Sequence, residues 1–591
     1  MYPTFTLLSL ALLGGVEALP NGMSHKRSSG ATPAAKTLPI ASTQPTGAAA
    51  VPADFVGLNV ESSFLNNYSN EFSNNLVSAL AARMSVPPIV RVGGTSGDEF
   101  VFDPAQTRHV KMCIGGECPT GSAASFKVGP GFFEGYKAFP DARMTIQAPL
   151  GPNVNETVVR AFMRQAWEAR VGAVGGNGSE WKSKIDTIAL GNEPEFYTHD
   201  VRKYVNDTLK LEEIIIDELK LEGDDRKIFE AGNSAKQPIS QYDVADILKN
   251  GMDKNKLIKA TAEHLYQIDT NEDWNDKTMQ DLMLSHKAIV QRFESSYQRS
   301  LRASQAHGIP YQISETSAVL ASPINSFVSG FGFALWVVDF SLATAARGVA
   351  RVNHMAGRPI ANHVLWTPDH TGGRRNPGPQ ARAPFAAAVM VADFLRPSSG
   401  GAGAGIGGDN EGGDNSEGGD SGSASGSPFT VLNQKRKQDA HVANGEEDVA
   451  IHEIDLDRDE NPYLSAYAAY SGGKLQRVAL VNMRLYNGTA AREQGGTMRR
   501  GSETFRIPVP HGVEAVQVQR LHADLGAAAM GFDHSGPQHN VTWAGEQWSK
   551  KVDEGKGHFA QGTSQTMEAV KVMGGVAAIK VPDSEAVMVS L

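Results

Sequence analysis

The sequence lacks most of the features that mark metal-binding, membrane-spanning or nucleic-acid-binding proteins. It has only two cysteines, which leaves too few thiol ligands for a structural metal. Beyond the first residues, no uncharged apolar run reaches the about 18 residues of a membrane span, because Asp339 interrupts the longest candidate. The net charge of −10 argues against nucleic acid or an anionic membrane as a partner. We therefore expect no metal, no cofactor and two soluble structured domains.

The first residues have the composition of a secretory leader. An apolar run covers residues 5–16, and small residues follow around Ala18, which is typical of a signal peptide over 1–18. Outside the cell, Cys113 and Cys118 in their Gly-rich loop predict one small disulfide. Six sequons predict a glycosylated, secreted protein: Asn67, Asn155, Asn177, Asn206, Asn487 and Asn540.

Apolar runs alternate with helical periodicity through the first two thirds of the chain. The strand candidates are 55–60, 89–94, 185–190, 227–231, 258–266, 311–314 and 348–353, and the main helix candidates are 72–84, 158–171, 211–221, 282–306 and 331–346. Roughly eight such alternations favour a closed (β/α)₈ barrel, an α/β fold. No G-x-G-x-x-G follows the first strand, which argues against a dinucleotide-binding fold. We place this TIM barrel over 50–397.

The composition changes after the barrel. Residues 398–428 are almost entirely Gly, Ser, Ala, Asp and Glu, and a mixed-charge piece follows, so 398–448 predicts a flexible insertion that cannot form a core. Short β-rich segments separated by turn residues fill 449–591. They predict a C-terminal all-β sandwich, to which a strand from 32–50 can add.

Two glutamates follow strand candidates. Glu193 stands in the run IALGNEP and Glu315 in YQISETS. Because the active site of a (β/α)₈ barrel lies at the C-terminal ends of its strands, both carboxylates open into the same mouth. Glycosidic bond hydrolysis needs such a pair, whereas either glutamate alone would read as a solvated loop residue. Pro194 disfavours helical geometry at the residue before it, which predicts an extended Glu193.

At these motifs the chain resembles the clan A retaining glycosidases, and more narrowly glycoside hydrolase family 79, the fungal and bacterial β-glucuronidases related to heparanase. The segments that carry the resemblance are GNEP at 191–194, SETS at 314–317, GLNVES at 57–62, VRVGG at 90–94, EHLY at 263–266, and the stretches 333–354 and 584–589. The resemblance covers nearly the whole chain outside the leader and the insertion. It implies a (β/α)₈ barrel with a β-domain and glucuronidase activity.

The resemblance also implies catalytic roles. Glu315 would attack the anomeric carbon, and Glu193 would protonate the leaving oxygen and then activate water. Asn192 matches an amide that bonds the sugar 2-hydroxyl, although a turn cap is the alternative. Tyr266 matches a phenol that donates to the nucleophile and keeps it ionised.

Four further residues are candidates for substrate contact. Arg91 on the second strand could stabilise the charge of the nucleophile or serve as a structural ion-pair partner. Glu61 matches a first-strand carboxylate of the sugar subsite, and a loop anion is the alternative. His264 and His354 stand at strand ends, where a histidine is either a substrate contact or a satisfied structural group.

The expected substrate carries a uronic acid, whose carboxylate requires hydrogen-bond donors. The resemblance assigns them to the loop after the nucleophile, 316–323, which has little charge and no tyrosine, so backbone amides would have to serve. Basic clusters that would bind heparan sulfate are not evident around the motifs. This favours an exo-acting enzyme that releases glucuronic acid or its 4-O-methyl form from a glycan or glycoprotein. The alternatives are a hydrolase of neutral β-glycosides, a heparanase-like endo-enzyme, and a non-catalytic carbohydrate-binding or cell-wall protein.

Overall fold

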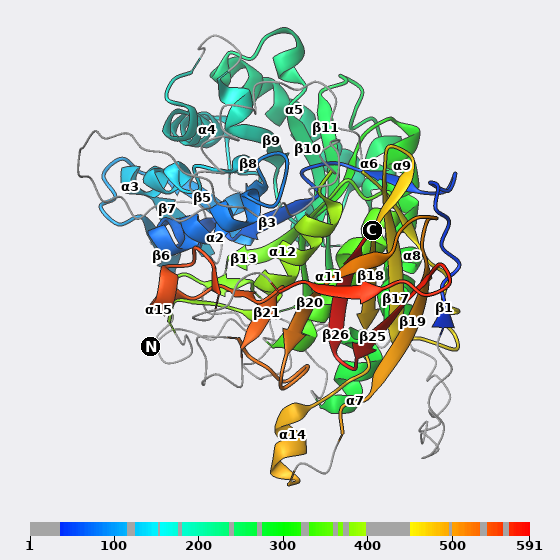
Figure 1. The fold of residues 1–591 in the computed structure, drawn as a ribbon. Coiled ribbons are helices and arrows are strands. Elements are labelled where there is room, and N and C mark those ends of the chain that lie inside the picture. The colour runs from blue at the N-terminus through cyan, green and yellow to red at the C-terminus, as the bar shows by residue number, and fades with distance from the viewer. Residues whose placement is uncertain are drawn as a thin grey trace, which may run out of the picture.

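The structure is a computed structural model in which two parts of the chain lie side by side (Figure 1). The described residues are 36–114, 124–151, 154–174, 180–235, 242–268, 275–320, 330–357, 364–369, 378–397, 449–495, 499–531, 540–559 and 566–591. The predicted signal peptide and the predicted insertion lie outside them. Among the helices of the described part, none combines the length and the hydrophobicity needed to cross a bilayer.

Eight parallel strands close into a barrel, which confirms the predicted fold class. In spatial order they are β3 (Val56–Val60), β4 (Ile89–Val92), β8 (Arg143–Ala148), β9 (Ile185–Leu190), β10 (Phe229–Ser234), β11 (Ile258–Ile268), β12 (Tyr311–Val319) and β13 (Arg351–Gly357), which returns to β3. Nearly every strand residue is buried, because helices cover the outer face and side chains fill the interior. This is why the strands read as apolar runs in the sequence. Their parallel direction brings all eight C-terminal ends to one mouth.

Helices follow the strands, and five of the main ones begin at side-chain caps. The main ones are α2 (Glu71–Ala81), α4 (Glu156–Val171), α5 (Val201–Leu219), α6 (Val244–Lys249), α8 (His286–Ser296), α9 (Gln298–Ala306), α11 (Phe331–Ala346) and α12 (Ala383–Leu395). Asn70, Asn155, Asp200 and Ser285 each accept a backbone N–H of the first turn, and Asp243 forms a capping box. These bonds satisfy donors that the helix itself leaves free.

Ion pairs close the opposite end of the barrel, where the strands begin. Asp186 contacts Arg351 at 2.7 Å, Arg143 at 2.9 Å and Lys259 at 3.0 Å. Asp54 pairs with the same two arginines at 2.6 and 2.8 Å. Burial alone would raise the pKa of Asp186, but the three cations outweigh it and lower that pKa. The charges at this end are fully paired among themselves and stabilise the barrel floor.

The C-terminal part is a pair of β-sheets. In spatial order the strands of the large sheet are β2 (Ala49–Val51), β16 (Val449–Glu453), β17 (Leu464–Ser471), β18 (Lys474–Asn482), β26 (Glu585–Ser590), β20 (Ala515–Ala523), β21 (Val541–Trp543), β22 (Glu546–Gln547) and β23 (His558–Phe559). Strand β24 (Glu568–Lys571) also pairs with β20. The small sheet is β1 (Lys36–Thr37), β19 (Ser502–Pro508) and β25 (Val576–Pro582). A separate apolar cluster that includes Tyr470, Phe505 and Ile579 fills the space between the sheets. This is the predicted sandwich, and β1 and β2, which precede the barrel in sequence, belong to its sheets.

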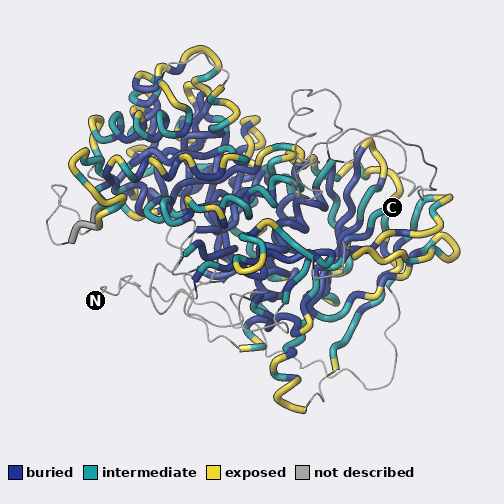
Figure 2. Tube along the Cα trace, turned by 60° about the vertical axis from the view of Figure 1, so that its left-hand side comes forward, coloured by how far each residue is buried: buried dark blue, intermediate teal, exposed yellow. Residues whose placement is uncertain are grey.

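The other face of the large sheet packs against the barrel through α11 and α12. Residues 331–345 of α11 and every residue of α12 are buried, so neither helix has the polar stripe of a surface helix. The main core cluster accordingly extends from the barrel to Tyr467, Leu521 and Trp543 of the sheet. Figure 2 shows buried chain throughout both parts.

A charged cluster lies inside this interface. His286 bonds Asp339 through Nδ1 at 3.0 Å and Glu453 of the β-domain through Nε2 at 3.1 Å. Tyr467 donates to Asp339 at 2.6 Å, and Arg347 donates to Glu453 at 2.5 Å. Burial alone would lower the pKa of His286, but Asp339 and Glu453 outweigh it and raise that pKa to about 9. We name this group the interface cluster.

The shorter elements complete the fold. They are the sheet β5 (Phe100–Phe102), β7 (Ala124–Val128), β6 (Val110–Ile114), the pair β14 (Trp366–Thr367) and β15 (Gln380–Ala381), the helices α1 (Leu65–Tyr68), α3 (Pro130–Phe133), α7 (Asp276–Thr278), α14 (Gly488–Glu493), α15 (Lys550–Asp553), the 3₁₀ turns η1 (Ser62–Phe64), η2 (Thr95–Glu99), η3 (Glu134–Lys137), η4 (Trp181–Ser183), η5 (Pro194–Phe196), η6 (Gly223–Arg226), and the π turn η7 (Met279–Met283).

Three local predictions need correction. The helix predicted over 282–306 is two helices, because α8 ends before Tyr297 and α9 begins after it. Strand β12 continues to Val319 rather than ending at Ser314. Strand β8 was not predicted, because Arg143, Thr145 and Gln147 interrupt its apolar run.

Candidate active site

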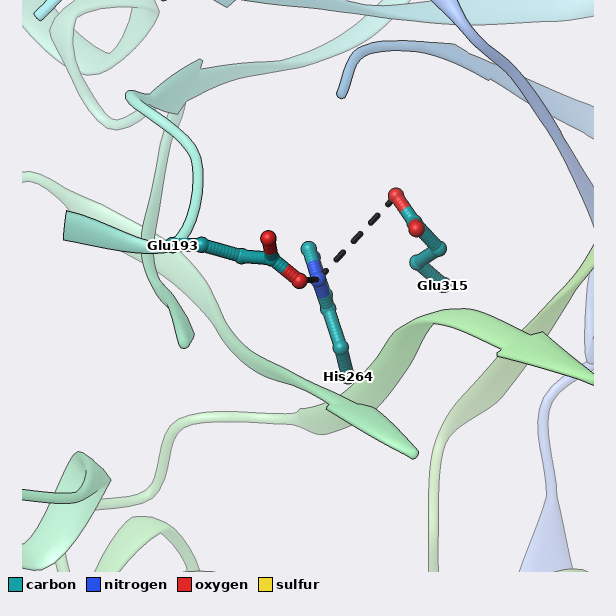
Figure 3. Close-up of side chains that lie close together, drawn as sticks. All are labelled: Glu193, His264 and Glu315. Carbon is teal, nitrogen blue, oxygen red and sulfur yellow. Dashed lines mark hydrogen bonds and ion pairs between the residues drawn. The ribbon is translucent and has the colours of Figure 1, made fainter. Parts of the chain in front are cut away.

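The mouth of the barrel brings the two predicted catalytic glutamates together. Glu193 follows the end of β9, whereas Glu315 lies within β12. Figure 3 shows the two carboxylates approaching each other with the imidazole of His264, from β11, between them. Nδ1 of His264 is 3.0 Å from Glu193 Oε1 and 4.0 Å from Glu315 Oε2. One donor atom from each of the three side chains lies within 4.8 Å of the others.

The backbone of Glu193 differs from the prediction. Its φ of 43° and ψ of 52° are left-handed, not extended. Pro194 excludes the right-handed helical region for Glu193, and two hydrogen bonds then select the left-handed one. Glu193 N donates to Asn233 O at 2.8 Å, and Phe196 N donates to Glu193 O at 3.1 Å. A left-handed non-glycine residue costs about 1–2 kcal/mol, which is typical of backbone held for function.

Three side chains donate hydrogen bonds to the Glu315 carboxylate. Tyr266 OH lies 2.6 Å from Oε1, and Arg91 Nη1 and Asn59 Nδ2 lie 3.2 and 3.3 Å from Oε2. Arg91 is fully buried, so its charge is poorly screened and stabilises the carboxylate anion. Arg91 Nη2 also donates to the amide oxygen of Asn192 at 2.8 Å. Tyr266, Arg91 and Asn192, all predicted from the sequence, therefore converge on the two glutamates.

Asp98 is a buried residue of the mouth that the sequence reasoning missed. Its carboxylate accepts hydrogen bonds from Asn192 N at 2.9 Å, Tyr197 OH at 2.8 Å, Gln147 Nε2 at 2.9 Å and Leu150 N at 3.2 Å. Burial raises the pKa of Asp98 to about 7, against the lowering effect of these donors. Asp98 thus fixes the backbone immediately before Glu193.

Asn59 was also missed, although the sequence holds a signal for it. Asn59 on β3 and Arg91 on β4 are neighbours in register, and Arg91 Nη1 donates to Asn59 Oδ1 at 2.8 Å. Each is the polar residue in an otherwise apolar strand core, LNV and VRV. A polar side chain inside such a strand requires a buried partner, and paired strands can supply it.

Two residues predicted to contact the substrate, Glu61 and His354, are placed differently from Tyr266, Arg91 and Asn192. Glu61 is half-buried after β3, and its Oε1 accepts from Ser96 N at 3.1 Å and from the Ser96 hydroxyl. These contacts hold the Glu61 carboxylate against the turn η2 that follows β4.

His354 is a correction, because its side chain points away from the mouth. Its Nε2 bonds Ser341 of α11 at 2.9 Å, and the ring lies edge-on to Trp336. Its strand neighbour Met355 faces Asn59 instead, as the alternation of a strand requires. Burial lowers the pKa of His354 to about 3. It is a neutral structural histidine.

The residues near the glutamates are poorly suited to bind a cation. Glu193, His264 and Glu315 are the group of donor atoms in the described chain that is close enough to share a metal ion. However, Arg91 already places a positive charge 3.2 Å from Glu315, which opposes a second cation there. The donor set suits proton transfer and covalent chemistry better than metal binding.

The predicted modification sites are distributed over the surface and the undescribed segments. Asn155 and Asn206 are exposed, Asn67, Asn487 and Asn540 are half-buried, and Asn177 lies outside the described residues. Cys118 also lies outside them, so the predicted Cys113–Cys118 disulfide stays a prediction.

Comparison with known proteins shows which proteins the chain resembles. Residues 466–588 match the glycosyl hydrolase family 79 C-terminal beta domain. A β-glucuronidase of Aspergillus niger is 25% identical over 99% of both chains, and one of Neurospora crassa is 25% identical over 86% of both. A 4-O-α-L-rhamnosyl-β-D-glucuronidase structure from Fusarium oxysporum shares the fold with a TM-score of 0.67 at 17% identity, covering 94% of this chain and all of that one. An arabinofuranosidase of family 51 from Xanthomonas axonopodis shares it with a TM-score of 0.54 at 12% identity, covering 92% and 97% of the two chains.

The fold, the carboxylate pair and these relatives together define a glycosidase built on a (β/α)₈ barrel with a β-domain. The resemblance predicted from the motifs is also confirmed: the C-terminal domain matches family 79, and the chain is similar over 99% of its length to a fungal β-glucuronidase.

Proposed function

We propose that the protein is a retaining, exo-acting β-glucuronidase that works outside the cell. The observation that carries the retaining mechanism is the short span between the two carboxylates, since an oxygen of each lies within 4.8 Å of one of the other. Carboxyl groups about 5–5.5 Å apart are typical of retaining enzymes, whereas inverting enzymes need about 6.5–9.5 Å to admit a water molecule.

The reaction then has two steps. The Glu315 carboxylate attacks the anomeric carbon and forms a glycosyl ester, while Glu193 gives its proton to the leaving oxygen. Glu193, now a carboxylate, takes a proton from water, the water oxygen bonds the same carbon, and the ester bond breaks to restore Glu315. Two inversions at one carbon give net retention.

The neighbouring side chains support these steps. Tyr266, Arg91 and Asn59 hold Glu315 in place and stabilise its charge before attack and after release. His264 holds the carboxyl of Glu193. Because the amide oxygen of Asn192 is bonded to Arg91, its Nδ2 is the group that can donate to a sugar hydroxyl in the transition state.

The glucuronide assignment rests on the relatives. The two relatives named above are β-glucuronidases, and one of them matches 99% of this chain. The region assigned to the uronate carboxylate, 316–323, is only partly a loop: Thr316 to Val319 belong to β12 and are buried, and 321–323 lie outside the described residues. The first four residues of this region are therefore strand residues rather than loop residues.

Hydrolysis of a panel of 4-nitrophenyl glycosides tests the substrate. We expect turnover of the β-glucuronide and none of the β-glucoside, β-galactoside or β-xyloside. Turnover of the β-glucoside instead would favour a hydrolase of neutral sugars. Release of single glucuronic acid residues, rather than oligosaccharides, from a glucuronide-capped glycan checks the exo mode.

The extracellular location has its own test. The predicted leader and the exposed sequons at Asn155 and Asn206 support it. Expression of the full chain in a fungal host should yield protein in the medium that begins after residue 18 and loses mass on treatment with an N-glycosidase. Retention of all product inside the cells with an intact leader would contradict secretion.

A further inference from the structure

Asn233 lies between the two strands that carry the glutamates and contacts both sides. It is fully buried near the end of β10 and has a left-handed backbone with a φ of 53°. Its backbone oxygen accepts the hydrogen bond from Glu193 N at 2.8 Å. Its side-chain Oδ1 accepts a hydrogen bond from Ser314 Oγ at 2.7 Å. Ser314 directly precedes Glu315, so one residue is bonded to the immediate backbone of both.

Asn233 and Ser314 are also the extra residues of two β-bulges. Along β10 the register steps from Gly232 to Ser234 while β11 advances by one residue, which leaves Asn233 unpaired. Along β12 the register steps from Ile313 to Glu315 while β11 again advances by one. A bulge bends its strand and redirects the side chains next to it. The Asn233–Ser314 hydrogen bond therefore joins the bulge directly before Glu315 to the bulge whose backbone oxygen binds Glu193 N.

We propose that Asn233 is a positioning residue that sets Glu193 and Glu315 relative to each other by locking these two bulges. The proposal rests on the catalytic roles proposed above for the two glutamates. Asparagine suits the position because it tolerates left-handed backbone and carries an acceptor of the right length. A residue without the amide loses the Ser314 bond, and a residue that resists a positive φ disturbs the Glu193 bond.

Variants separate the two contributions. N233G keeps the left-handed backbone and removes the side chain, S314A removes the other partner, and N233A removes the side chain and disfavours the backbone. We expect N233G and S314A each to lower kcat about three- to tenfold, with little change in KM. The double variant N233G/S314A should lose no more than N233G alone, because the bond to Ser314 is already absent in N233G. N233A should lose about a further fivefold or more.

A second readout follows from the link to Glu193. Glucuronyl fluoride has a leaving group that needs little protonation, whereas a sugar leaving group depends on the acid. The loss in N233A should therefore be larger for a glucuronyl disaccharide than for glucuronyl fluoride. A purely structural role would lower both rates equally.

Lys220 supplies the matched control. It has the same left-handed geometry, with a φ of 56°, but is an exposed helix cap away from the mouth. K220A should have a lower melting temperature than K220G, as N233A should have a lower one than N233G. In contrast to the Asn233 variants, both Lys220 variants should keep the kcat of the wild type. If the Asn233 variants alter only the melting temperature, or if the double variant loses the product of the two single losses, the proposal is overturned. Failure of the glucuronide assignment is a separate result, because the same ratios can be measured on whichever β-glycoside the wild type cleaves.

Discussion

Two histidines in this molecule each lie between two carboxylates, yet only one of them lies at the barrel mouth. His264 stands between Glu193 and Glu315, and His286 stands between Asp339 and Glu453 in the interface cluster. In each group a tyrosine donates to one carboxylate at 2.6 Å, Tyr266 in the mouth and Tyr467 in the interface. The residue types are therefore the same in both places.

The two groups differ in how far their hydrogen-bonding capacity is used. Both ring nitrogens of His286 are bonded, whereas Nε2 of His264 has no hydrogen-bond partner in the described chain. Glu453 is bonded by both His286 and Arg347. Glu193, in contrast, has His264 as its one side-chain partner among the residues the structure describes. The interface cluster, whose hydrogen-bonding groups are paired, holds the two domains together. The group at the mouth keeps hydrogen-bonding capacity with which it can receive a substrate.

The largest effect should come from removing the glutamates themselves. E315Q removes the proposed nucleophile and should lower kcat by at least about 10³-fold, and E193Q should lower it about 10²- to 10⁴-fold on a sugar leaving group. E453Q is the interface counterpart. It should leave kcat within about twofold and lower the melting temperature, since His286 loses a partner. Steady-state kinetics and calorimetry on the three variants measure both effects.

The opposite pattern of losses would contradict this comparison. Hydrolysis that survives E193Q and E315Q within about tenfold would remove the proposed roles. A large loss of kcat in E453Q at full stability would show that the interface cluster takes part in turnover.

The tyrosine pair gives a smaller and more closely matched effect. Y266F removes a hydrogen bond to Glu315, the proposed nucleophile. A bond to a charged group is worth about 1.5–3 kcal/mol, so kcat should fall about 10- to 100-fold. Y467F removes an equally short bond to Asp339 and should lower stability without changing kcat. Both hydroxyl deletions keep the ring, so packing is preserved. Equal kinetic losses in the two variants would contradict the division between mouth and interface.

The smallest effect is the dependence of stability on pH. The pKa of His286 is raised to about 9 in the folded protein, above the unfolded value of about 6.5. Its contribution to stability is therefore fully present below about pH 6.5 and is lost as the pH rises through about 9. The melting temperature of the wild type should fall over this range more steeply than that of H286Q. Parallel curves for the two proteins would show that His286 does not carry this dependence.

Much of the fold could be predicted because buried parallel strands leave a direct trace in the sequence. Runs such as VGLNV and IVRV are typical of strands in a sheet that is covered on both faces. Strand β8 left no such trace, since Arg143 belongs to the barrel floor and Thr145 and Gln147 bond other buried groups. The break at Tyr297 and the extension of β12 depend on packing that periodicity does not report.

The sequence predicts those residues of the site that stand at the ends of recognisable strands. Glu193, Glu315 and Tyr266 stand in short motifs whose position in a barrel determines where they open. Asp98 and Asn233 are different, because they act through backbone groups of residues far away in sequence, Asn192 N and Glu193 N. The left-handed Glu193 belongs to the same class: Pro194 restricts its backbone, and tertiary hydrogen bonds choose among the conformations that remain.

Covalent trapping tests the central claim most directly. A 2-deoxy-2-fluoro-β-glucuronyl fluoride slows both steps but keeps a good leaving group, so the glycosyl ester should accumulate. Mass spectrometry of the digested protein should then find one added 2-deoxy-2-fluoroglucuronyl group, on the peptide that carries Glu315 and on no other. Attachment to another residue, or turnover of the natural glucuronide with the α-anomer as first product, would contradict the account.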